Sequence, residues 1–239
     1  MKQLLAALAI GSLLTGCASS NVSSDRERFL RVAGKPVVNP SDIVRAELAF
    51  ARLAREKGQW TAFRETAAPD ALMFTPELVS AQVWLRNKAD PAQATDWQTH
   101  KIFMSCDGSM GVSTGAWQGA SGSVGYFTTI WTKQDAEIRR ERGKEIEWKW
   151  IFDHGVPLDE PLPEPDYVTT QVATCSKTPL PAAASAPSGD NQKSGYSGDG
   201  TMFWSAESSA DKSRSLVVKM WNGTAWEDII FDDVEAPAE

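Results

Sequence analysis

Histidine and cysteine, the usual zinc ligands, are scarce in this sequence of 239 residues. It contains 2 histidines and 3 cysteines. The histidines, His100 and His154, lie 54 residues apart, and no cysteine is placed near either in a spacing typical of a zinc site. We therefore expect no metal ion and no other cofactor.

Basic residues are too few to favour a nucleic-acid partner. Lys and Arg total 24 against 31 for Asp and Glu, so the net charge is −7. A protein that neutralises phosphates needs a basic face, so we expect no nucleic acid as a partner. Hydrophobic residues make up 42% of the chain and charged residues 23%, which is typical of a globular protein.

No apolar run among the first residues is long enough to cross a bilayer. The run from Leu4 to Leu14 has eleven residues, which suits the core of a signal peptide. It ends in Leu14-Thr15-Gly16-Cys17, which resembles the bacterial lipobox, the motif that precedes a lipid-bearing cysteine. The alternative is an ordinary secretory signal with an incidental cysteine.

This resemblance implies a lipoprotein. It predicts a signal peptide at residues 1–16, a lipid on Cys17 and a membrane as partner, with the chain in the bacterial cell envelope. Residue 18 is Ala and not Asp, which for a Gram-negative source implies the outer membrane, facing the periplasm.

Lipidation of Cys17 leaves Cys106 and Cys175. An even pair in an oxidising compartment is a candidate disulfide. A buried free thiol at Cys106 is the alternative.

The chain divides into segments that differ in amino-acid composition and hydrophobic pattern. Residues 17–40 predict a polar tether, 41–175 a folded domain, 176–200 a flexible linker rich in Pro, Ala, Ser and Gly, and 201–239 a small β meander. In the domain, Ser41 is the expected cap of an apolar-striped helix that ends at Gly58, and shorter helices are expected at 60–67 and 80–87. Strands are expected at 71–75, 97–106, 109–118, 123–134, 145–153 and 168–175.

The meander at the C-terminus should have three strands, packed on the main domain because it is too small to be stable alone. Its last two strands are separated by Asn222-Gly223, a strong hairpin signal. Helices followed by antiparallel strands indicate the α+β class.

The stretch from Ile43 to Pro157 resembles the nuclear transport factor 2-like superfamily, near domains related to ketosteroid isomerase and polyketide cyclase. Four pieces carry the resemblance: Ala46-Glu47-Leu48-Ala49-Phe50-Ala51, Trp60-Thr61-Ala62-Phe63 running into Ala68-Pro69-Asp70-Ala71-Leu72-Met73-Phe74, Ser109 to Gly115 leading to Gly125 to Trp131, and Glu147 to Gly155. The resemblance implies a cone, in which N-terminal helices pack on a curved antiparallel sheet and enclose a pocket that often takes a small ligand.

Two departures count against isomerase chemistry. The family's ketosteroid isomerases have an aspartate base directly before a proline, where this chain has Thr75-Pro76. They also have a tyrosine on the first helix as an oxyanion donor, where this chain offers only Phe50.

Three residues remain candidates for catalysis. They are His100, expected to share a strand face with Ile102 and Met104, and Asp153 and His154, expected to end a strand where the cone opens. Neighbours on a strand point to opposite faces, so Asp153 and His154 should not act side by side. For each candidate a purely structural role is the alternative, and no Ser–His–Asp set or carboxylate pair can be assembled from the order alone.

The candidate pocket residues are Phe50, Met73, Thr75, His100, Trp117, Tyr126, Trp131 and Trp150. Aromatic stripes of this kind also form cores or dimer faces, which leaves a homodimer open. Three functions follow: a lipid-anchored, non-catalytic domain that binds a small apolar ligand, a cyclase or dehydratase using His100, Asp153 or His154, and an envelope interaction or dimerisation module.

Overall fold

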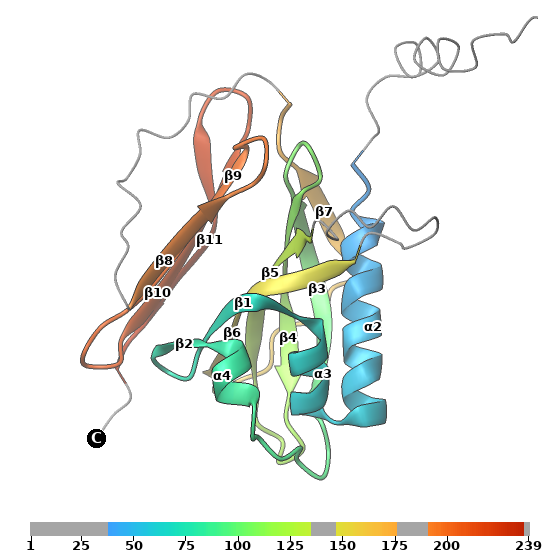
Figure 1. Ribbon diagram of the computed structural model, residues 1–239. Coiled ribbons are helices and arrows are strands. Elements are labelled where there is room, and N and C mark those ends of the chain that lie inside the picture. The colour runs from blue at the N-terminus through green and yellow to red at the C-terminus, as the bar shows by residue number, and fades with distance from the viewer. Residues whose placement is uncertain (1–37, 135–146, 176–190, 237–239) are drawn as a thin grey trace, which may run out of the picture. The chain divides into compact units, whose positions relative to one another are not determined.

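The computed structural model describes residues 38–134, 147–175 and 191–236 (Figure 1). The expected signal peptide, Cys17, most of the tether and residues 176–190 of the expected linker lie outside these ranges. No helix among the described residues is both long and apolar enough to cross a membrane.

The helices are short apart from the first. They are α2 (Ser41–Lys57), α3 (Gln59–Thr66) and α4 (Ala81–Leu85). In α2, Ile43, Glu47, Phe50 and Ala54 are buried at helical spacing, which gives the expected stripe. The expected cap is wrong by one residue: Ser41 is the first helical residue and Pro40 occupies the cap position, because the backbone N–H groups of Ile43 and Val44 bond to the Pro40 carbonyl.

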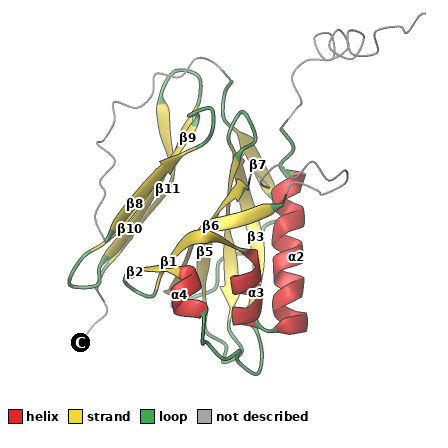
Figure 2. Cartoon of the chain, viewed as in Figure 1, coloured by secondary structure: helices red, strands yellow, loops and turns green. Residues whose placement is uncertain are grey.

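The helices pack on a seven-stranded sheet, and α4 lies between its second and third strands in the chain (Figure 2). Its strands are β1 (Ala67–Phe74), β2 (Leu78–Ser80), β3 (Asp96–Met104), β4 (Met110–Gln118), β5 (Val124–Lys133), β6 (Trp148–Leu158) and β7 (Thr169–Val172). Their order is β2-β1-β6-β5-β4-β3-β7, with β1 parallel to β6 and β7 parallel to β3. The fold is therefore mixed helix and sheet, mostly sheet, and the curved sheet is not closed into a barrel.

Strand β6 runs further than the sequence indicated. The expected strand ended at 153, with a turn before Gly155, whereas β6 continues to Leu158. It continues because β5 pairs with it throughout, with Tyr126 opposite Val156 and Val124 opposite Leu158. Asp153, His154 and Gly155 consequently lie inside a strand.

The C-terminal residues form a second sheet of four strands, one more than expected. These are β8 (Gln192–Tyr196), β9 (Met202–Ser208), β10 (Arg214–Trp221) and β11 (Trp226–Val234), in the order β11-β10-β9-β8. Strand β8 lies within the stretch expected to be linker, so that prediction is wrong for residues 192–196. Its polar residues pair with β9 as an edge strand and gave no apolar alternation to read. The turn at Asn222-Gly223, with Gly223 at φ 104°, joins β10 to β11.

Two groups of buried side chains flank the seven-stranded sheet. One packs the helices against its first face and includes Ile43, Phe50, Trp131 and Trp150. The other joins its second face to the C-terminal sheet and includes Phe152, Trp204, Leu216 and Val218. Cys106 and Cys175, the pair named from the sequence, form a disulfide with Cα atoms 5.2 Å apart.

A β-bulge at His100 changes which face of β3 this residue occupies. The register of β3 with β4 passes from Thr99 opposite Gly115 to Lys101 opposite Thr114, so His100 is the additional residue. A Cβ on Gly115 would lie 1.9 Å from the Gln98 carbonyl oxygen, so the close approach of the bulged backbone requires glycine there.

Candidate functional site

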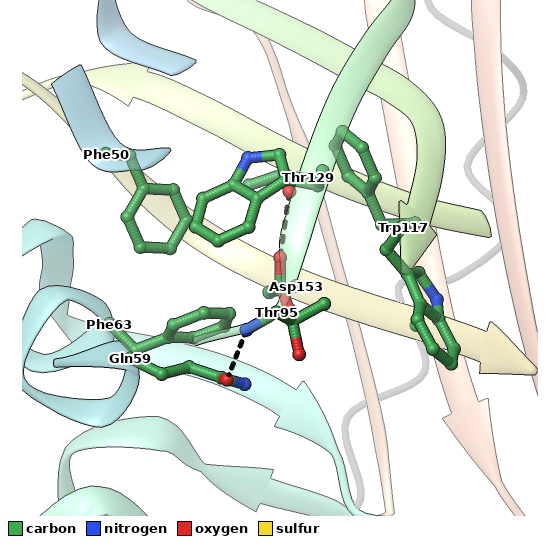
Figure 3. A pocket seen from close by; sticks show the side chains of 10 residues that line it. Phe50, Gln59, Phe63, Thr95, Trp117, Thr129 and Asp153 are labelled. Carbon is green, nitrogen blue, oxygen red and sulfur yellow. Dashed lines mark hydrogen bonds between the residues drawn. The ribbon is translucent and has the colours of Figure 1, made fainter. Parts of the chain in front are cut away.

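A cavity of about 180 Å³ lies on the helix side of the seven-stranded sheet (Figure 3). Helices α2 and α3 supply Phe50, Gln59 and Phe63, and strands β3 to β6 supply most of the remainder. The complete lining is Phe50, Gln59, Phe63, Thr95, Trp97, Trp117, Phe127, Thr129, Asp153 and Gly155.

The apolar wall is an aromatic cluster. Phe50 packs edge to face on both Phe63 and Trp97, with ring centroids 4.8 Å apart in each pair. Contacts of this geometry are favourable beyond the area they bury and hold the rings in place. Figure 3 shows Phe50 and Phe63 on one side of Asp153 and Trp117 on the other. The cavity is therefore bounded by fixed rings.

Asp153 is the ionisable side chain in this lining. Strand alternation turns it toward the helices, and Oγ1 of Thr129 donates a hydrogen bond of 2.8 Å to its Oδ2. Burial raises the pKa of Asp153 to about 7, the Thr129 bond opposes this rise, and the nearby carboxyl of Glu47 adds to it. A carboxyl with this pKa exchanges its proton near neutral pH.

Glu47 lies almost entirely buried on α2, with 3% of its surface exposed. Its Oε1 accepts hydrogen bonds from Trp131 Nε1 at 3.1 Å and from Ser113 Oγ, and its Oε2 accepts one from Trp97 Nε1 at 3.1 Å. Burial raises its pKa above the usual range, and these three donors oppose the rise. Because Trp97 both bonds Glu47 and lines the cavity, Glu47 fixes one wall of the site.

His154 faces away from this cavity, toward the C-terminal sheet. It is 1% exposed, and its ring contacts the edge of Phe74 with centroids 5.3 Å apart. Its Nε2 lies 3.6 Å from Oδ2 of Asp232, too far for a hydrogen bond, and neither ring nitrogen has a partner among the described residues. Burial and then the charge of Arg214 lower its pKa to about 3, so the imidazole is neutral and forms no ion pair with Asp232.

The structure separates the residues that the sequence had grouped as pocket candidates. Phe50 and Trp117 line the aromatic cavity, whereas Met73, Trp131 and Trp150 are buried in the core beside the helices. Thr75 lies outside the cavity lining, in the turn between β1 and β2, where its N–H bonds to the Glu77 carbonyl.

His100 and Tyr126 lie on the opposite face of the sheet. They line a cleft that also contains Asp232 of β11, and Tyr126 donates a hydrogen bond of 3.0 Å from its hydroxyl to Asp232 Oδ1. The expectation that His100 shares a face with Ile102 and Met104 is therefore wrong, because the bulge reverses the alternation at this residue.

Sequence reasoning missed several lining residues. Phe63, Gln59 and Thr95 come from α3 and a loop, whose positions depend on tertiary packing. Glu47 does not line the cavity but bonds Trp97, which does. It could have been detected from the sequence, since an acidic residue at the centre of an apolar helical stripe must be buried or break the stripe.

Comparisons with known proteins add no family assignment. No protein-family model matches the chain, and the search of curated proteins finds no match either. Among the described residues no group of three or more His, Cys, Asp or Glu side chains is placed to hold a metal ion.

Proposed function

We propose that this chain is a bacterial cell-envelope lipoprotein whose nuclear transport factor 2-like domain binds a small, mainly apolar ligand. The lipid on Cys17 would hold it at a membrane, and the aromatic cavity would receive the ligand. The observation that carries the proposal is the cavity itself, with five aromatic side chains and few polar groups. Ligand sites typically combine an apolar lining with a small number of placed polar groups.

The order of elements supports the family resemblance. Two helices, a short antiparallel pair, a short helix and then four antiparallel strands follow one another. The resemblance implies N-terminal helices packed on a curved antiparallel sheet, and this order is compatible with it. The helices cover one face of a curved sheet, and the cavity lies between the helices and the sheet. Fold alone leaves the ligand open, so the proposal rests on the cavity.

Gly155 offers a way to test occupancy. A Cβ at this position would meet Trp117 Nε1 at 3.6 Å, an ordinary contact, so a larger side chain can enter the cavity without distorting the strand. In native mass spectrometry of the mature protein from its host, we expect a small molecule to accompany the wild type and the Gly155→Ala control. We expect Gly155→Leu to lose it. An empty wild-type protein, or the same molecule retained by Gly155→Leu, would contradict ligand binding in this cavity.

The anchor is tested separately. Cys17→Ser should leave the membrane fraction or accumulate as the unprocessed precursor, because the thiol that takes the lipid is gone. A variant that still sediments with membranes at the mature size would show that Cys17 carries no anchor.

Asp153 favours a second candidate, an enzyme that transfers a proton. Its carboxyl lies inside the cavity and its pKa is about 7, which suits general acid–base catalysis near neutral pH. If this candidate holds, Asp153→Asn should co-purify with a molecule of different mass or structure from that in the wild type, namely the unconverted substrate. An identical molecule in both proteins favours binding without turnover.

A further inference from the structure

The lining of the cavity contains one acidic group and no basic group. Of the residues that line it, Asp153 alone is ionisable. The charged group acting on it from the packed elements is the carboxyl of Glu47 on α2, which has the same sign. When Asp153 is ionised, a ligand in this cavity therefore meets a negative potential, which repels an anion and attracts a cation.

One oxygen of Asp153 is free to meet a ligand. Oδ2 accepts the bond from Thr129, while Oδ1 has no hydrogen-bond partner among the described residues. Thr129 thus orients the carboxyl and leaves one acceptor available. An ammonium group, which has only donors, complements such an acceptor.

The tryptophans of the wall have no N–H left to offer. Trp97 donates its indole N–H to Glu47, and Trp117 donates its own to the Tyr126 carbonyl at 2.9 Å. With Phe50, Phe63 and Phe127 they line the cavity with aromatic rings. The faces of such rings carry partial negative charge and attract cations, including alkylammonium groups.

We propose that the ligand is a cationic amine: an apolar body about the size of one ring, bearing an ammonium group that bonds to Asp153 Oδ1 among the aromatic side chains. This inference rests on the proposed ligand-binding function and specifies the class of ligand. The size follows from the cavity of about 180 Å³, since a cavity of about 150 Å³ holds benzene.

The inference carries a pH dependence. The cation needs the ionised form of Asp153, whose pKa in the empty cavity is about 7. Glu47 is the other acid that acts on Asp153, and the remaining lining residues do not titrate. The amine should therefore bind more tightly at pH 8 than at pH 6, and below pH 7 its binding should release a proton.

Three one-ring probes of similar size test the charge preference. They are benzylamine, which is cationic at pH 8, benzyl alcohol, which is neutral, and benzoate, which is anionic. Binding to the mature protein is followed by tryptophan fluorescence, with free probe measured by equilibrium dialysis. We expect benzylamine to bind about tenfold more tightly than benzyl alcohol at pH 8 and benzoate to bind more weakly than either.

Variants assign the effect to Asp153. Asp153→Asn keeps the shape of the side chain and the acceptor for Thr129. It should remove most of the difference in affinity between benzylamine and benzyl alcohol and leave the affinity for benzyl alcohol unchanged. Asp232 is a carboxyl on the other face of the sheet, so Asp232→Asn should change the affinity for neither benzylamine nor benzyl alcohol. Equal or tighter binding of benzyl alcohol would overturn the amine inference and leave the binding cavity in place. Failure of all three probes to bind would overturn both.

Discussion

Asp153→Asn should change how the stability of this protein depends on pH. The Asp153 side chain is partly buried, and this burial raises the pKa of its carboxyl from an ordinary 3.8 to about 7. Between these values the folded chain keeps the proton and the unfolded chain has lost it. Folding of the wild type is therefore favoured at low pH, and this contribution is lost as the pH rises through 7. Asparagine keeps the acceptor for Thr129 and removes the titration.

The magnitude follows from the shift. About three pKa units correspond to about 4 kcal/mol of differential interaction between the two protonation states. Asp153 is only partly buried, so contact with solvent screens this interaction and reduces its contribution. We therefore expect the free energy of unfolding of Asp153→Asn, relative to wild type, to rise by about 2–3 kcal/mol between pH 4.5 and pH 8.

Urea unfolding at several pH values measures this difference directly. Tryptophan fluorescence reports the transition, and equal m-values in the two proteins would show that the same surface is exposed in each. A free-energy difference that stays constant across this pH range, or falls as the pH rises, would refute the placement of Asp153 as a buried, protonated carboxyl.

Two further predictions concern the other face of the sheet and the disulfide. The pKa of His154 is lowered from its ordinary 6.5 to about 3. Between these two pH values the unfolded chain binds a proton at His154 and the folded chain does not, so the wild type loses stability as the pH falls from 6.5 to 3. His154→Phe should unfold at a lower pH in an acid titration followed by circular dichroism, and an unchanged midpoint would contradict a buried neutral imidazole. Replacing both Cys106 and Cys175 with serine opens a loop with a sequence separation of 69 residues and should lower the free energy of unfolding by about 4 kcal/mol. Equal urea midpoints for the serine variant and oxidised wild type would show that the bridge does not constrain the chain.

Periodicity in the sequence predicted the elements whose burial is one-sided. The stripe of α2 and the alternation of β10 each follow from one face that is more deeply buried than the other. In β10, Leu216, Val218 and Met220 are buried, whereas Val217 and Lys219 between them are partly exposed. Strand β8 was not predicted because three of its five residues, Gln192–Tyr196, are polar and two of the five are exposed at the sheet edge. An edge strand of this kind is held by backbone hydrogen bonds, which the side-chain pattern does not encode.

His100 shows how one backbone irregularity redirects a candidate site. Strict alternation along β3 placed it with Ile102 and Met104, inside the helix-side layer. The bulge adds one residue at this point and moves His100 to the face that meets β11. Gly115 on the neighbouring strand is the feature that permits the bulge, and a lone glycine in a strand is only a weak sign of one.

The proximity of Asp153 and Glu47 could not be predicted from the sequence, because it depends on tertiary structure. They are 106 residues apart in the sequence, and nothing local connects a helix at the start of the domain with its sixth strand. The fold brings them close enough for Glu47 to raise the pKa of Asp153. A buried acid next to a partly buried one, with an aromatic wall and no basic residue in the lining, is costly to keep ionised unless a ligand or a proton compensates the charge. That cost gives a cationic occupant a physical reason to bind, which the sequence alone could not have supplied.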